Sequence, residues 1–141
     1  MIIPDEFKLA TTICLDFNAT ISFAHTGEGS EIDLPKRRIL IDLEEVTSIE
    51  WFWSLIFHEL AHMWCYDNDV YYIYHHDSLA PERMAIYVRK MGFKIEQYVD
   101  SEGAEWMKEY FPDMQYMPSY RDCEEDRAFF DKWVNRSYPL K

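Results

Sequence analysis

The sequence has few of the features that mark secreted, membrane-spanning or cysteine-rich proteins. Its 141 residues include three cysteines, Cys14, Cys65 and Cys123, which are odd in number and widely spaced. They predict reduced thiols and argue against a disulfide framework or a cysteine-based zinc site. No apolar run reaches the length of a bilayer span, and the first ten residues lack the basic and apolar pattern of a signal peptide. We therefore expect a cytoplasmic protein that makes no membrane contact.

Basic residues are also scarce. The chain has 14 lysines and arginines against 26 aspartates and glutamates, which gives a net charge of −12. A domain this acidic is repelled by phosphate backbones, so we expect no direct binding to DNA or RNA. Solubility is the simplest role of the charge. The alternatives are a basic partner or substrate, or imitation of the charge of a nucleic acid.

The residues that are abundant indicate one globular domain over positions 1–141. Apolar residues make up 48% of the chain and aromatic residues 17%, with no internal repeats. Apolar spacing and turn residues predict an α+β fold, in which a small β-sheet precedes a buried central helix and further helices. The expected strands are 20–25 and 38–43. The expected helices are 5–18 (with an alternating strand as its rival), 48–67, 78–91, 94–110 and 122–136, and 111–120 is expected to be a loop.

The central segment carries an H-E-x-x-H motif, His58-Glu59-Leu60-Ala61-His62. It lies within the expected helix from Ser48 to Asp67, where Thr47 and Glu50 have the spacing of a capping box. Histidines four residues apart share one helix face, so two neutral imidazoles can bind one zinc ion. Glu59 then lies beside the open position of the metal as a general base. The plainer interpretation is a core helix whose histidines are hydrogen bonded.

A catalytic zinc site usually needs a third protein ligand. His75 is the first choice, with its neighbour His76 as the close alternative, because both lie just before an expected helix, on a segment short enough to fold back over the central helix. Glu82 is the second choice, since its offset of 20 from His62 is similar to that of the glutamate ligand in gluzincins. Glu124 or Glu125 is the third. A donor for the developing oxyanion is also expected, and the candidates are Tyr71, Tyr72, Tyr74 and Arg83.

The motif and its flanks resemble the SprT-like zinc metalloproteases, including their short phage and plasmid members. The similarity covers roughly positions 38 to 93: the H-E-x-x-H motif, then a histidine, then a helix that ends near Gly92. In that family an apolar residue often lies four positions after the third histidine, and Leu79 has that relation to His75. The linker after His62 is shorter than in the family, and no C-terminal CxxC pair is present.

This resemblance implies a minimal zincin-like metallopeptidase domain with one catalytic Zn²⁺ held by His58, His62 and His75. The implied activity is hydrolysis of peptide bonds in a protein or peptide substrate, through a zinc-bound water and with Glu59 as the general base. The alternative function is non-enzymatic. An acidic binding or inhibitory module could keep the same scaffold with a structural metal or none, and engage a partner through its charge.

Overall fold

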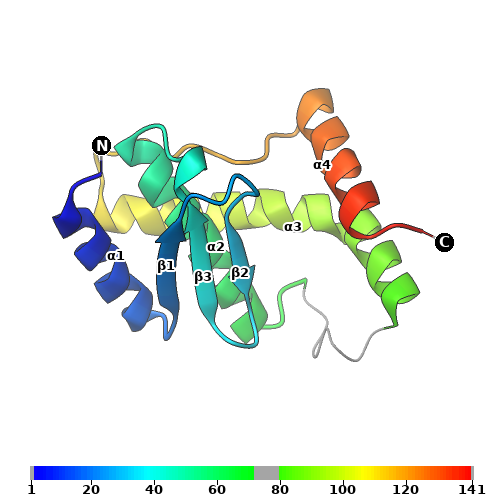
Figure 1. Ribbon diagram of the computed structural model, residues 1–141, viewed down its shortest axis with the longest axis horizontal. Coiled ribbons are helices and arrows are strands. Elements are labelled where there is room, and N and C mark those ends of the chain that lie inside the picture. The colour runs from blue at the N-terminus through cyan, green and yellow to red at the C-terminus, as the bar shows by residue number, and fades with distance from the viewer. Residues whose placement is uncertain (1, 72–79, 141) are drawn as a thin grey trace.

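The computed structural model describes residues 2–71 and 80–140, and these residues form an α+β fold (Figure 1). Four α-helices, a short 3₁₀-helix and a small mixed sheet account for the regular structure of the described residues, so the expected α+β class is confirmed. In chain order the elements are α1 (Pro4–Asp16), β1 (Thr20–Ala24), β2 (Glu31–Asp33), β3 (Arg38–Asp42), the 3₁₀-helix η1 (Leu43–Glu45), α2 (Ile49–Asp67), α3 (Pro81–Tyr110) and α4 (Glu124–Ser137).

The sheet has the strand order β1-β3-β2, with β3 parallel to β1 and antiparallel to β2. Both longer strands were expected from their alternating apolar residues. The edge strand β2 was not, because its three residues include one apolar side chain, Ile32, which is too little pattern to read. Ile39 and Ile41 of β3 are fully buried and belong to the same core as the apolar residues of α2.

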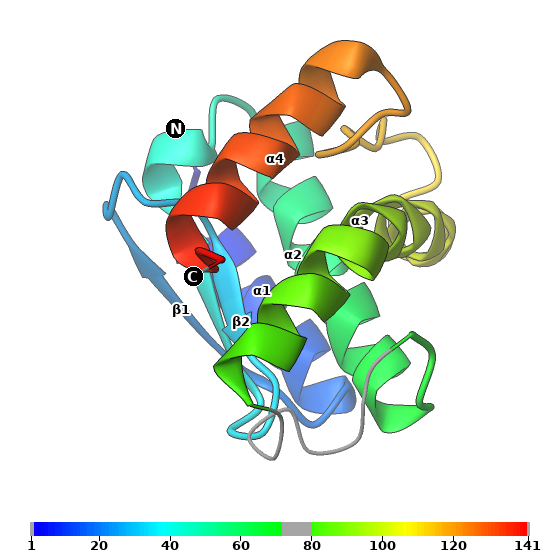
Figure 2. The ribbon, with the colours of Figure 1, turned by 90° about the vertical axis from the view of Figure 1, so that its right-hand side faces the viewer.

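Helix α2 is the centre of the molecule, between the sheet on one side and α3 on the other (Figures 1 and 2). Its apolar residues point in every direction, as expected of a helix that is buried on all sides. The helix begins one residue later than the expected capping box implies, because the N-cap is Ser48 and not Thr47. Ser48 is the N-cap, and its hydroxyl oxygen accepts a hydrogen bond of 3.1 Å from the backbone N–H of Trp51.

Helix α3 is continuous from Pro81 to Tyr110, so the prediction of two helices separated at Gly92 is wrong. Glycine costs about 1 kcal/mol relative to alanine inside a helix, and here both interior glycines allow close packing. A Cβ atom on Gly92 would lie 2.6 Å from the ring of Phe130 in α4, and one on Gly103 would lie 2.9 Å from the carbonyl oxygen of Phe57 in α2. These glycines bring α4 and α2 against the same helix.

The predicted absence of disulfides and membrane spans agrees with the described part of the chain. Cys14, Cys65 and Cys123 are all free thiols. Burial raises the pKa of Cys14 and of Cys65 to about 12, which keeps both as unreactive thiols at neutral pH. No helix among the described residues combines the length and the apolar character of a bilayer span.

Candidate metal centre

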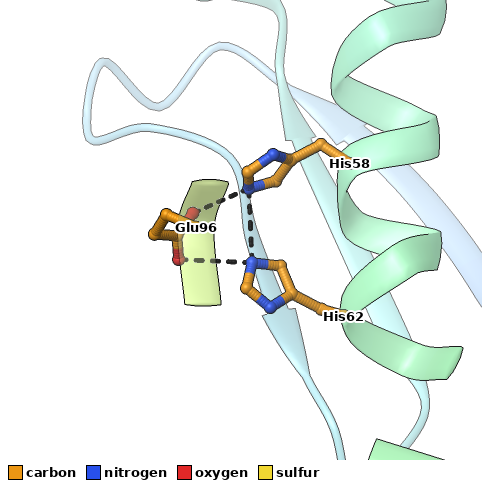
Figure 3. Close-up of side chains that lie close together, drawn as sticks. All are labelled: His58, His62 and Glu96. Carbon is orange, nitrogen blue, oxygen red and sulfur yellow. Dashed lines mark hydrogen bonds and ion pairs between the residues drawn. The ribbon is translucent and has the colours of Figure 1, made fainter. Parts of the chain in front are cut away.

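Three side chains from α2 and α3 converge on one point (Figure 3). His58 and His62 project from the same face of α2, and Glu96 of α3 faces both of them. The Nε2 atoms of the two histidines are 3.2 Å apart. The carboxylate of Glu96 spans the pair, with one oxygen 2.9 Å from Nε2 of His58 and the other 3.2 Å from Nε2 of His62.

The spacing of these three side chains is close to that of the ligands of a small divalent cation. Zinc binds imidazole nitrogen and carboxylate oxygen at about 2.0–2.2 Å, usually with tetrahedral geometry, which keeps neighbouring ligand atoms roughly 3.3–3.5 Å apart. Here the two Nε2 atoms are 3.2 Å apart, and each contacts a different oxygen of Glu96, at 2.9 and 3.2 Å, so the groups lie slightly closer together than in such a site. Two imidazoles and one carboxylate are also a donor set found in catalytic zinc sites, where a fourth position stays open. The residues present therefore fit zinc in chemistry and need only a small outward shift to fit it in size.

Asp100 supports the first histidine from behind. Its Oδ1 atom lies 2.8 Å from Nδ1 of His58, a contact in which the ring donates its Nδ1–H. This hydrogen bond holds the proton on Nδ1, so Nε2, which faces Glu96, is the nitrogen that can bind a metal once its own proton is lost. Because Asp100 follows Glu96 by one helical turn, α3 supplies both the facing carboxylate and the supporting one.

The two carboxylates of α3 dominate the electrostatics at His58, which is 4% exposed. Burial by itself lowers the pKa of this imidazole. The charge of Glu96 and the hydrogen bonds that His58 donates to Asp100 and Glu96 outweigh that effect and raise the pKa well above its ordinary value. Burial also raises the pKa of Glu96, but the charges of His62 and His58 prevail and hold it well below its usual range. The cluster thus favours a positively charged His58 beside an ionised Glu96, and a bound cation would satisfy the same carboxylate.

Glu59 lies on α2 between the two histidines in the chain and is 6% exposed. Burial raises the pKa of its carboxyl group, against the opposing charges of His58 and His62. A carboxylate with a raised pKa holds a proton more readily near neutral pH, which is the property of a general base and acid.

No other group of three His, Cys, Asp or Glu side chains in residues 2–71 and 80–140 has the spacing of metal ligands.

The structure brings together two of the three ligands that the sequence analysis favoured, His58 and His62. His75 and its alternative His76 lie outside the described residues, so His75 stays a prediction. Glu82 is exposed in the first turn of α3 and precedes Glu96 by 14 residues, about 21 Å along the helix axis, so it does not join the cluster. Glu124 and Glu125 are exposed in the first turn of α4 and also lie outside it.

Sequence reasoning missed Glu96 because it took Gly92 as a helix end. Glu96 follows His62 by 34 residues, a longer offset than the one that drew attention to Glu82. A usable signal was nevertheless present. If α3 is taken as continuous, Glu96 and Asp100 form a pair of carboxylates four residues apart in an otherwise amphipathic helix, the same spacing as the two histidines.

Comparison with known proteins adds no relative: no family model, no curated protein and no solved structure matches this chain. The resemblance to SprT-like proteases therefore remains a prediction from the motif and its flanks, and the geometry of the site carries the functional argument.

Proposed function

We propose that the protein is a zinc-dependent metallopeptidase with a zincin-like core, in which His58, His62 and Glu96 hold the metal and Glu59 is the general base. Glu96 takes the place that sequence reasoning gave to His75. The observation that carries the proposal is the cluster of two imidazoles from α2 and one carboxylate from α3, whose nearest nitrogen and oxygen atoms are 2.9–3.2 Å apart. The hydrogen bond that His58 donates to Asp100 is typical of metal-binding histidines.

The zinc ion, when bound, supplies Lewis acidity that lowers the pKa of a water molecule to roughly 7 and polarises a carbonyl group. Glu59 accepts one proton from the attacking water while a C–O bond forms at the scissile carbonyl carbon. Glu59 then gives this proton to the amide nitrogen as the C–N bond breaks, so the products are a carboxylic acid and an amine, which become a carboxylate and an ammonium group when the acid proton passes to the amine. Its raised pKa suits both transfers.

The scaffold supports this role by holding the ligands rigidly before any metal arrives. His58, Glu59 and His62 are each less than 8% exposed, on a helix that is packed between the sheet and α3. Packed side chains on regular elements lose little freedom on binding a metal, which favours both affinity and a fixed reaction geometry. The net charge of −12 further favours a basic segment of a protein or peptide as the substrate.

The test compares Glu59→Gln with the parent on a denatured protein substrate. We expect Glu59→Gln to keep one zinc per chain and to lose at least about 100-fold in cleavage rate, because a positioned base contributes roughly 10²–10⁴-fold. A chelator should abolish the activity of the parent. Glu109→Gln, which removes an exposed carboxylate at the far end of α3, is the matched control and should cleave like the parent.

Equal cleavage by Glu59→Gln and the parent would show that Glu59 is not the base. A parent protein that takes up zinc and cleaves no peptide would contradict the peptidase proposal and leave the acidic binding module with a structural metal.

A further inference from the structure

The connection between α3 and α4 runs back along α3 (Figure 1), and two of its tyrosines, Tyr116 and Tyr120, contact Asp100. Tyr116 uses its hydroxyl for structure, since it donates a hydrogen bond of 2.8 Å to Oδ1 of Asp100. Tyr120 is held differently. Its backbone N–H donates a hydrogen bond of 2.8 Å to Oδ2 of the same aspartate, and this leaves the side chain for other contacts.

The ring of Tyr120 contacts two phenylalanines. Its centroid is 6.1 Å from the ring of Phe93 and 5.9 Å from that of Phe130 in α4, both in edge-to-face contact. Phe93, Glu96 and Asp100 follow one another at helical spacing on one face of α3, over about 10 Å. Tyr120 is held at Asp100 by its backbone and contacts Phe93 with its ring, so it spans the stretch of α3 that contains Glu96.

The hydroxyl of Tyr120 makes no hydrogen bond within the part of the chain that the structure describes. The acidic groups of the site act on the phenol through their charge. Burial raises its pKa, and the charges of Glu96, Glu59 and Asp100 raise it further, in that order. The hydroxyl therefore stays protonated at neutral pH. An O–H group on this half-buried side chain that no described residue accepts from is available to a bound molecule.

We propose that Tyr120 is a catalytic residue, whose hydroxyl donates a hydrogen bond to the oxygen of the scissile carbonyl. This role rests on the peptidase function proposed above. As water adds to the carbonyl carbon, the electron pair of the C=O bond moves onto this oxygen, and the Tyr120 hydroxyl stabilises the negative charge without giving up its proton. The oxyanion donor that sequence reasoning sought among Tyr71, Tyr72, Tyr74 and Arg83 is thus assigned to a residue outside that set.

Two of those earlier candidates lie elsewhere in the structure. Tyr71 is 43% exposed and contacts the ring of Tyr98, and Arg83 is exposed in the first turn of α3, far along the helix from Glu96. Tyr72 and Tyr74 lie outside the described residues.

The test is Tyr120→Phe, which keeps the ring, its contacts with Phe93 and Phe130, and the backbone hydrogen bond to Asp100. We expect kcat on a peptide substrate to fall by about 100- to 1000-fold, the usual effect of losing one oxyanion donor, with KM and zinc affinity within about threefold of the parent. Tyr87→Phe is the matched control. Its hydroxyl is buried without a hydrogen-bond partner and packs near a separate cluster that contains Ile95, so this variant should keep the parent rate.

A binding measurement separates this role from a merely structural one. A phosphinic peptide carries a tetrahedral centre with charged oxygens and so resembles the transition state. We expect calorimetry to show that Tyr120→Phe binds the phosphinic peptide about 100-fold more weakly than the parent does. Substrate binding is measured in the Glu59→Gln background, where the peptide is not cleaved. There the affinity for the peptide should change by less than about threefold when Tyr120→Phe is added.

Three results would overturn the assignment, and they are distinguishable. A kcat of Tyr120→Phe within threefold of the parent refutes the role of this residue alone. If Tyr120→Phe loses activity only in proportion to the zinc that it loses, Tyr120 is a structural residue. A zinc-loaded parent that neither cleaves peptides nor binds the phosphinic peptide refutes the peptidase function itself, before any variant is compared.

Discussion

Replacing Asp100 by asparagine tests whether the buried carboxylate behind His58 belongs to a metal centre. Asp100 is 5% exposed and accepts three hydrogen bonds, from His58 and Tyr116 at one oxygen and from the backbone of Tyr120 at the other, each at 2.8 Å. Asparagine has the same shape but one accepting oxygen. If that oxygen serves His58 and Tyr116, the amide NH₂ faces the N–H of Tyr120, and one buried donor is left without an acceptor.

The size of the effect follows from this arrangement. A buried donor without a partner costs about 1–3 kcal/mol, so the free energy of unfolding of the metal-free protein should fall by about that amount. Zinc affinity should fall in addition, because the neutral amide no longer raises the basicity of the His58 ring. Loss of such a supporting carboxylate typically costs about 10- to 100-fold in affinity, or about 1.4–2.7 kcal/mol.

Two assays separate the effects. Competition with a chromophoric chelator gives the zinc dissociation constant, and urea unfolding in excess chelator gives the stability of the metal-free protein. Asp113→Asn, which changes an exposed carboxylate in the loop after α3, is the matched control and should alter neither. If Asp100→Asn binds zinc as tightly as the parent, within about twofold, then His58 is not a zinc ligand supported by Asp100 and the geometric argument fails.

Three further predictions concern the cluster and its frame. Glu96→Gln should weaken zinc binding by more than the roughly 10–100-fold expected for Asp100→Asn, since it removes a proposed ligand; calorimetry measures this. Gly103→Ala should lower the free energy of unfolding, measured in urea, by about 1–2 kcal/mol. The added Cβ would lie 2.9 Å from the carbonyl oxygen of Phe57 and force α2 and α3 apart, which outweighs a gain of about 1 kcal/mol in helix propensity. In excess chelator, stability followed against pH should be greatest between about pH 4.5 and 6.5, the ordinary pKa values of Glu96 and His58.

The pH window follows from the signs of the two shifts. The pKa of Glu96 is lowered on folding, so its contribution is complete above its ordinary value and is lost as pH falls through the folded pKa. The pKa of His58 is raised, so its contribution is complete below its ordinary value and is lost as pH rises through the folded pKa. Metal-free protein that becomes steadily more stable between pH 6.5 and 9 would contradict this pairing. Zinc competes with protons for the same nitrogens, so its affinity should instead rise over that range.

The sequence predicts most of what depends on near neighbours in the chain. The H-E-x-x-H spacing places His58 and His62 on one face of a helix, and the alternating apolar residues of β1 and β3 indicate strands. The short edge strand β2 has too few residues to show a period. Thr47 and Ser48 are both good N-caps, and the choice between them depends on where the chain enters the helix.

The third side chain of the site could not be predicted in this way, because it depends on contacts between helices. Glu96 reaches the histidines only because α3 continues through Gly92 and packs closely on α2 at Gly103. A glycine in a helical pattern is ambiguous: it ends many helices, but it also lets two elements approach. The local spacing favours a helix end, but the close approach of Phe57 to Gly103 of α3 shows that the glycine allows two helices to pack.

The central claim is that His58, His62 and Glu96 together bind one divalent cation. Calorimetric titration of chelator-treated protein with zinc at pH 7 tests it most directly. The account predicts one zinc per chain for the parent and a large loss of affinity in both His58→Ala and Glu96→Gln. A parent that takes up no zinc, or variants that bind it as tightly as the parent, would contradict the claim.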